Sequence, residues 1–181
     1  MLNKILGGAL ALLLVAALVI TGIAATKPAT FEVKRERVVA APAGSVFANL
    51  SDFRRWQRWS PWEKLDPNLK RTYGGAEQGV GATYAWEGNS DAGAGKMTIT
   101  DSTPERQLKI RLDFTEPFAS TNSTIFDLVP EGQGTRVTWR MTGDNTFVGK
   151  VFSIFFDMDE MVGQDFERGL TNLERASQTQ S

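Results

Sequence analysis

The sequence predicts an α+β fold in which a curved antiparallel sheet of about seven strands packs around a long C-terminal helix, preceded by a transmembrane helix. Three observations lead to this prediction. Short segments that alternate apolar and polar residues, separated by glycine and proline turns, are typical of antiparallel strands. The C-terminal third carries apolar residues at helical spacing. The chain begins with an uncharged apolar run.

The N-terminal run is long enough to cross a bilayer. No charged residue lies between Ile5 and Ala25, and as a helix this run would be about 31 Å long, against a hydrocarbon core of about 30 Å. We therefore expect residues 1–27 to be a single-pass anchor and residues 28–181 to be the folded domain. A cleaved signal peptide is the alternative, because small residues near Ala25 suit cleavage, although the run exceeds the roughly 7–15 apolar residues of a signal core.

Two signals disagree about the side of the membrane. Lys27, Lys34, Arg35 and Arg37 follow the run, and a count of positive charges alone would keep the domain in the cytoplasm. A lysine just before a long apolar run, here Lys4, is typical of an export signal, and large domains translocate largely regardless of charge. We therefore expect a membrane-attached domain on the extracytoplasmic side.

The domain is expected to begin with a strand and two short helices. Residues 31–40 alternate apolar and charged side chains, as in a strand with one solvated face. Pro42 suits the first position of a helix, and apolar residues at helical spacing follow it. A second short helix is expected over 53–59, ending before Pro61 because a proline disfavours helix in the residue before it.

A meander of strands follows, each with one apolar face. Leu108, Ile110 and Leu112 alternate with Lys109 and Arg111, as in an antiparallel sheet with one face in water. The expected strands are 68–74, 80–87, 94–101, 106–114, 120–129 and 134–143.

The C-terminal helix is expected from Phe147 to Leu173, with a break near Asp157–Asp159, and it is the element large enough to cover the apolar face of the sheet. A strongly curved sheet around one helix leaves a space, and ligand pockets are concave and mostly apolar. The side chains expected in this cavity are Trp62, Tyr84, Trp86, Met97, Phe114, Asn122, Phe126, Trp139, Met158 and Met161. Trp62 is expected there as part of the cluster Trp56, Trp59 and Trp62, and most of the others by strand alternation or helical spacing.

Composition excludes several kinds of site. The chain has 20 Lys and Arg against 21 Asp and Glu, so it lacks the basic surface of a nucleic-acid-binding protein. It has no Cys and no His, which excludes thiolate and histidine ligands, cysteine nucleophiles and a Ser-His-Asp triad. We expect no metal, cofactor or catalytic residue. Glu63 is interpreted as a solvated loop charge near Lys64; the alternative is an acid or base at the cavity entrance.

The order of elements and several motifs resemble the START-like helix-grip superfamily, in its polyketide cyclase/dehydrase and lipid-transport branch and in its membrane-anchored bacterial form. The resemblance covers residues 31–176. The motifs are Ala41-Pro42 before Val46-Phe47, Trp56-x-x-Trp59-Ser60-Pro61-Trp62, Gly79-Val80-Gly81-Ala82, Trp86-Glu87-Gly88-Asn89, Gly95-x-Met97, Gly134-Thr135-x-Val137-Thr138-Trp139 and Asp165-Phe166-Glu167-x-Gly169-Leu170. This resemblance implies a cavity for a hydrophobic ligand.

Three functions remain open. The first is a membrane-tethered domain that binds a hydrophobic small molecule or lipid. The second is an enzyme of the cyclase or dehydrase kind, in which a cavity carboxylate or Tyr84 moves protons. The third is a protein-interaction module that holds a partner on its grooved face, for which an exposed apolar patch without an enclosed cavity would argue.

Overall fold

The computed structural model describes residues 2–178, with the side chains of residues 7, 8 and 12–178. Among these residues seven strands form one antiparallel sheet in the order β1-β7-β6-β5-β4-β3-β2. The strands are β1 (Thr30–Val39), β2 (Lys70–Gly75), β3 (Ala82–Glu87), β4 (Ala94–Thr103), β5 (Gln107–Glu116), β6 (Ser120–Glu131) and β7 (Gly134–Asp144). Each lies within about two residues of its expected bounds, so the α+β prediction is confirmed.

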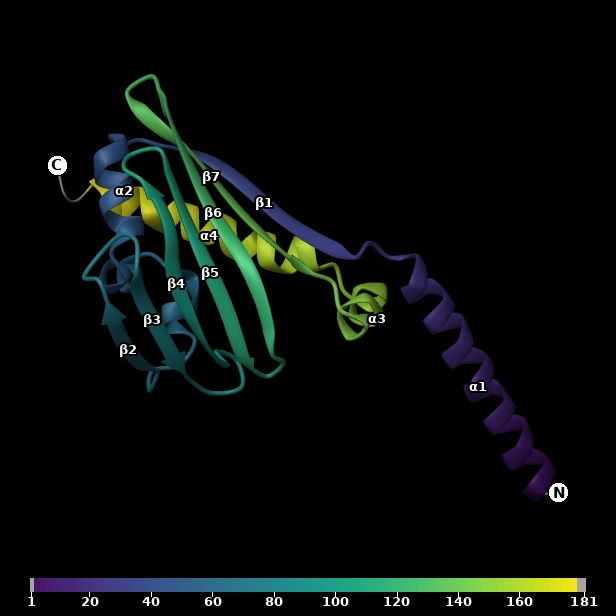
Figure 1. The fold of residues 1–181 in the computed structure, drawn as a ribbon. Coiled ribbons are helices and arrows are strands. Elements are labelled where there is room, and N and C mark those ends of the chain that lie inside the picture. Colours follow the sequence, from purple (N-terminus) through teal and green to yellow (C-terminus); the bar gives the residue numbers. More distant parts are fainter. Residues whose placement is uncertain (1, 179–181) are drawn as a thin grey trace.

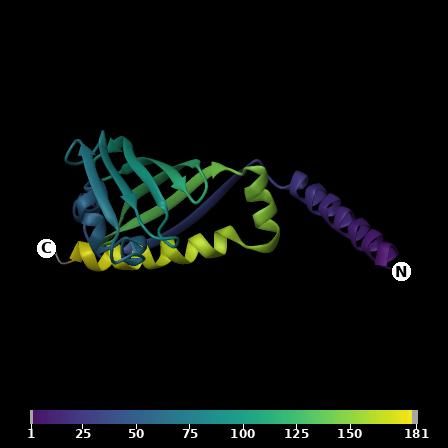
Figure 2. The same ribbon diagram turned by 90° about the horizontal axis from the view of Figure 1, so that it is seen from below.

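The sheet curves over one long helix. The helical elements are α1 (Leu2–Thr26), α2 (Ala43–Ser51), the 3-10 helices η1 (Phe53–Arg58) and η2 (Pro61–Lys64), α3 (Phe147–Phe155) and α4 (Met158–Gln178). Figures 1 and 2 show α4 running along the concave face of the sheet, with α2 near its C-terminal end. A register shift in β4 between Ile99 and Asp101 adds local bending, because a bulge increases the twist of its strand.

Aromatic side chains fill the space between the sheet and α4. The ring of Trp139 from β7 stacks on Phe166 of α4 with centroids 4.0 Å apart, and Phe126 of β6 lies 4.8 Å from Trp139. Gly169 permits this approach, because a Cβ there would lie 2.6 Å from Cζ3 of Trp139. Trp59 joins the same core, and its indole N–H donates to the Asn49 carbonyl at 3.1 Å.

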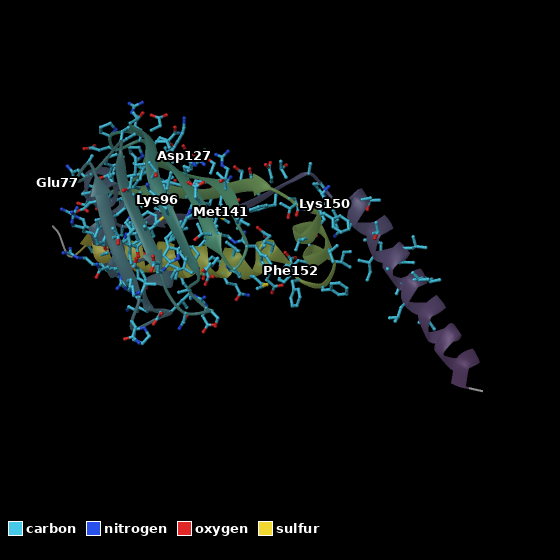
Figure 3. The ribbon with its side chains drawn as sticks, turned by 60° about the horizontal axis from the view of Figure 1, so that its bottom comes forward. Glu77, Lys96, Asp127, Met141, Lys150 and Phe152 are labelled. Atoms are coloured by element: carbon cyan, nitrogen blue, oxygen red, sulfur yellow. The ribbon has the colours of Figure 1, made fainter. Side chains whose placement is uncertain are left out.

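The helical pattern of the C-terminal third divides into two helices at Asp157, where the break was expected. The Asp157 carboxylate accepts from the Glu160 backbone N–H at 3.1 Å and so caps the start of α4. The preceding helix, α3, has no buried residue. It lies beyond the end of the sheet, with Lys150 and Phe152 at the outside of the molecule (Figure 3).

The N-terminal helix α1 extends away from the sheet and lies next to α3 (Figure 1). In the described part of the chain no helix is both long and apolar enough to cross a bilayer. This finding contradicts the expected single-pass anchor and the expected membrane localisation. Lys4 and the start of the expected span at Ile5 lie outside the described side chains.

Candidate functional site

An apolar cavity lies between the sheet and the start of α4. Its volume is about 190 Å³. The walls come from η1 and η2, from strands β3, β4, β5 and β7, and from Val162 of α4. The lining side chains are Trp56, Ser60, Trp62, Glu63, Leu69, Tyr84, Trp86, Ala92, Met97, Leu112, Phe114, Met141 and Val162. Most are aromatic or aliphatic, so the cavity favours an apolar occupant.

Contacts among its neighbours hold the aromatic wall in place. Trp86 and Phe114 meet edge to face, with centroids 5.7 Å apart, and the indole N–H of Trp86 donates to the Ala92 carbonyl at 3.0 Å. Gly95 lies beneath this ring: a Cβ there would lie 2.5 Å from Cη2 of Trp86. The orientation of Trp86 is thus fixed by packing and by one hydrogen bond.

One polar cluster interrupts the apolar lining. The hydroxyl of Tyr84 donates to Oε1 of Glu63 at 2.7 Å, and Nε of Arg71 donates to Oε2 at 2.7 Å. Arg71 also donates to the backbone carbonyls of Glu63 and Leu69, at 2.9 and 3.0 Å. The Glu63 side chain is only 5% exposed. Glu63 is therefore a buried, paired carboxylate, which corrects its interpretation as a solvated loop charge.

Burial and pairing also set the electrostatics of this cluster. Desolvation, followed by the hydrogen bond to Glu63, raises the pKa of Tyr84 well above its ordinary value. The hydrogen bond to Glu63 likewise raises the pKa of Arg71. Tyr84 therefore keeps its proton at neutral pH. The charges of Arg71 and Glu63 balance within the cluster.

The structure brings together half of the expected cavity residues. Trp62, Tyr84, Trp86, Met97 and Phe114 all line the cavity. The last four lie on strands that are neighbours in the sheet: Tyr84 pairs with Met97, and Gly95 pairs with Phe114. Alternation along these strands therefore placed their side chains on the same face.

The other five expected residues lie elsewhere. Phe126 and Trp139 are buried in the aromatic core, where Phe166 and Trp59 occupy the adjoining space. Asn122 lines a shallow hollow at the ends of β6 and β7, together with Thr121 and Gly143. Met158 and Met161 are 37% and 51% exposed in the first turn of α4.

Arg71, the partner of the buried carboxylate, was not among the residues predicted from the sequence. Arg71 is directly paired with Trp86 across β2 and β3, as Tyr73 is with Tyr84. Directly paired residues share a face of the sheet, so correct pairing of this hairpin would have placed Arg71 beside Tyr84. Glu63 carried no such signal, because it lies in a 3-10 turn without a repeating pattern.

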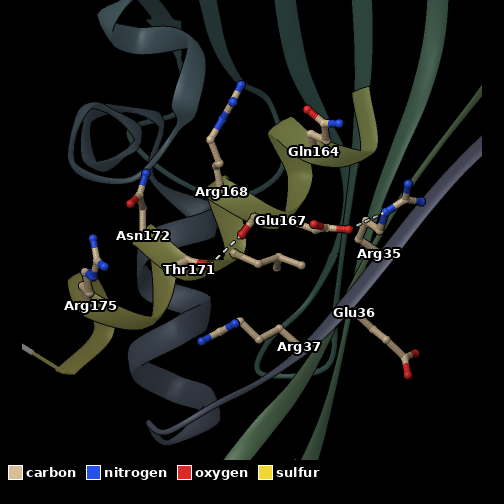
Figure 4. A pocket seen from close by; sticks show the side chains of 10 residues that line it. Arg35, Glu36, Arg37, Gln164, Glu167, Arg168, Thr171, Asn172 and Arg175 are labelled. Atoms are coloured by element: carbon tan, nitrogen blue, oxygen red, sulfur yellow. Dashed lines mark hydrogen bonds and ion pairs between the residues drawn. The ribbon is translucent and has the colours of Figure 1, made fainter. Parts of the chain in front are cut away.

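A larger hollow, of about 760 Å³, is an open groove between β1 and α4 (Figure 4). Its lining is mostly charged and internally paired. Arg35 bonds Asp159 and Glu167 at 3.0 Å each, and Arg37 bonds Glu174 at 2.8 Å. These pairs tie β1 to α4, so the groove is explained by the fold. No group of three or more carboxylates that could hold a metal ion occurs among the described residues.

Residues 30–178 match the family model described as polyketide cyclase/dehydrase and lipid transport. The chain belongs to this family. The match spans every strand of the sheet as well as α4. The expected START-like family is therefore confirmed, and the curved sheet around α4 is its helix-grip arrangement. None of the curated proteins compared with this chain matches it.

Solved structures of the same fold come from several bacteria. Protein CV1439 from Chromobacterium violaceum is 14% identical with a TM-score of 0.58, covering 82% of this chain and 96% of that one. An uncharacterized protein from Rhizobium leguminosarum is 18% identical with a TM-score of 0.60, covering 83% and 95%. DynU16, a protein of the dynemicin biosynthetic locus, is 16% identical with a TM-score of 0.54, covering 83% of this chain and 48% of that one. At these identities the likeness shows the fold alone.

Proposed function

We propose that this polyketide cyclase/dehydrase-family protein binds a hydrophobic small molecule in the cavity between its sheet and α4. The observation that carries the proposal is the cavity itself, about 190 Å³ in volume and walled mainly by aromatic and aliphatic side chains. Core packing normally leaves few voids larger than a water molecule. A cavity of this size that the fold does not fill is suited to an apolar ligand.

The volume limits the size of the ligand. An apolar cavity of about 150 Å³ holds benzene, so this one fits a ligand of one or two rings. A lipid with two acyl chains would require the cavity to enlarge. Burying about 200 Å² of apolar ligand surface contributes about 5 kcal/mol. Burial alone then corresponds to a dissociation constant on the order of 0.1–1 mM. Tighter binding would require polar contacts as well.

Native mass spectrometry of the full chain tests this proposal. We expect the protein purified from its own host to carry a stoichiometric apolar adduct, which can be extracted and identified. The variant Val162→Phe places a ring in the cavity and should lose the adduct. Val148→Phe makes the same change on α3, at a side chain that is 61% exposed, and should keep it.

Two results together would contradict ligand binding. The first is a bare mass for the purified protein. The second is the absence of any thermal stabilisation across a panel of small aromatic compounds. Binding that survives Val162→Phe unchanged would place the ligand outside the cavity.

A further inference from the structure

The polar cluster of the cavity limits which hydrophobic ligands fit. We propose that the ligand is a neutral apolar molecule with one hydroxyl group, which donates a hydrogen bond to the Glu63–Tyr84 pair. This inference rests on the proposed ligand cavity and deepens it. The reason is that both members of the pair present acceptors to the cavity and neither has a proton left to donate.

The Tyr84 hydroxyl and all three guanidinium nitrogens of Arg71 already donate to a partner. A carboxylate only accepts, and Glu63 receives one bond from Tyr84 and one from Arg71. The single hydroxyl proton of Tyr84 goes to Glu63, which leaves the lone pairs of its oxygen as acceptors. The three guanidinium nitrogens of Arg71 donate to Glu63 and to the Leu69 carbonyl, and Arg71 does not line the cavity.

Two other donors of the lining are already paired. The indole N–H groups of Trp56 and Trp86 donate to the carbonyls of Leu50 and Ala92. Ser60 carries a hydroxyl that both donates and accepts, so it tolerates a ligand hydroxyl as well. A ligand that carries only acceptors, such as a ketone or a carboxylate, would set an oxygen against the oxygens of Glu63 and Tyr84.

The charges of the cluster favour a ligand with a neutral hydrogen-bond donor over one with an ammonium group. Arg71 and Glu63 form an ion pair at 2.7 Å, with side chains 24% and 5% exposed. A cationic ligand would add an unpaired charge to a mostly apolar cavity, where burial of a charge is costly. A hydroxyl group donates a hydrogen bond and carries no net charge.

Phenol, toluene and protonated benzylamine are the probes for this inference. Phenol and toluene differ by a hydroxyl in place of a methyl group on one ring, and each is small enough for the cavity. Dissociation constants are measured for the full chain by following its tryptophan indole N–H resonances during titration. We expect phenol to bind at least as tightly as toluene, and benzylamine to bind at least about tenfold more weakly than phenol.

A variant that removes the cluster supplies the complementary result. Glu63→Met, Arg71→Met and Tyr84→Phe together replace the ion pair and the hydroxyl by apolar groups of similar size, a change that proteins often tolerate. In this variant phenol should bind about tenfold more weakly than toluene, because its hydroxyl loses the acceptor oxygens of Glu63 and Tyr84. Tyr73→Phe is the matched control: Tyr73 stacks on Tyr84 with centroids 5.2 Å apart, but its hydroxyl meets Gln57 outside the lining. It should leave the phenol-to-toluene ratio unchanged.

Three outcomes would overturn the inference. They are a tenfold preference of the wild-type protein for toluene, tighter binding of benzylamine than of phenol, and an unchanged phenol-to-toluene ratio in the triple variant. The first two use only the wild-type protein, so they hold even if the variant does not fold. If neither phenol nor toluene binds at all, the ligand cavity itself is refuted. If both bind equally in the wild type and in the triple variant, only the role of the hydroxyl is refuted.

Discussion

Glu63 is held from two sides at the wall of the cavity. Tyr84 and Arg71 each donate to one of its oxygens at 2.7 Å. A buried ion pair contributes little net stability, because the loss of hydration offsets most of the attraction. The proposed ligand would use the acceptor oxygens that this cluster presents to the cavity.

The hydroxyl of Tyr84 should make stability depend on pH above the ordinary tyrosine range. Burial, and then the bond to Glu63, raise the pKa of Tyr84 above 10.0 in the folded protein. Between pH 10 and the raised pKa the folded protein holds this proton while the unfolded chain releases it. The free energy of unfolding should therefore fall as pH rises above 10, by up to about 1.4 kcal/mol per pH unit from this group.

Urea unfolding at pH 8 to 11.5 measures this effect. Tyr84→Phe removes the ionisable hydroxyl, so its unfolding free energy should fall less steeply above pH 10 than that of the wild type. Below pH 10 the two curves should run parallel. Equal slopes above pH 10 would show that Tyr84 is not shielded as the structure indicates.

At the residue scale, strand alternation predicted the cavity wall better than the helix pattern did. Tyr84, Trp86 and Phe114 were predicted because alternation fixes which face of a strand a side chain occupies. Met161 lies in the same helical pattern as Phe166, but the Met161 side chain is 51% exposed whereas that of Phe166 is buried. A helical stripe shows which residues share a side, and it does not show where along the helix the sheet begins to cover that side.

Helices α3 and α4 differ in what covers them, although both carry apolar residues at helical spacing. α4 buries Phe166, Leu170 and Leu173 against the sheet and α2. None of the residues of α3 is buried. The break between the helices was predicted near Asp157, but the sequence could not show that only the second helix is covered. Gly163 and Gly169 mark the covered side, because a Cβ at either position would meet Arg35 or Trp139.

One substitution made in both helices tests this difference. Phe166→Ala should lower the free energy of unfolding by about 3–5 kcal/mol, because it leaves a cavity beside Trp139. Phe155→Ala on α3, where the side chain is 64% exposed, should change it by less than about 0.5 kcal/mol. Denaturant unfolding of both variants measures these values. Comparable losses would mean that α3 is covered in solution.

At the scale of the whole molecule, local patterns predicted the order of the elements but not the shape of the cavity. Each of the seven strands has its own alternation and turn residues, so it was predicted without knowledge of the others. The cavity depends on contacts between distant segments. Trp139 and Phe126 were expected in it, but Trp59, which follows η1, fills that end. The ring centroids of Trp59 and Trp139 are 5.6 Å apart. The space that remains lies toward β3, β4 and β5.

A crystal structure of the full chain with bromobenzene diffused into the crystals tests most directly whether this space receives a ligand. Bromine gives an anomalous signal that locates the ring without prior assumption. We expect a bromine peak inside the cavity, between Trp86, Phe114 and Val162. A cavity without bromine, with peaks confined to the groove between β1 and α4 or to the surface of α3, would contradict it.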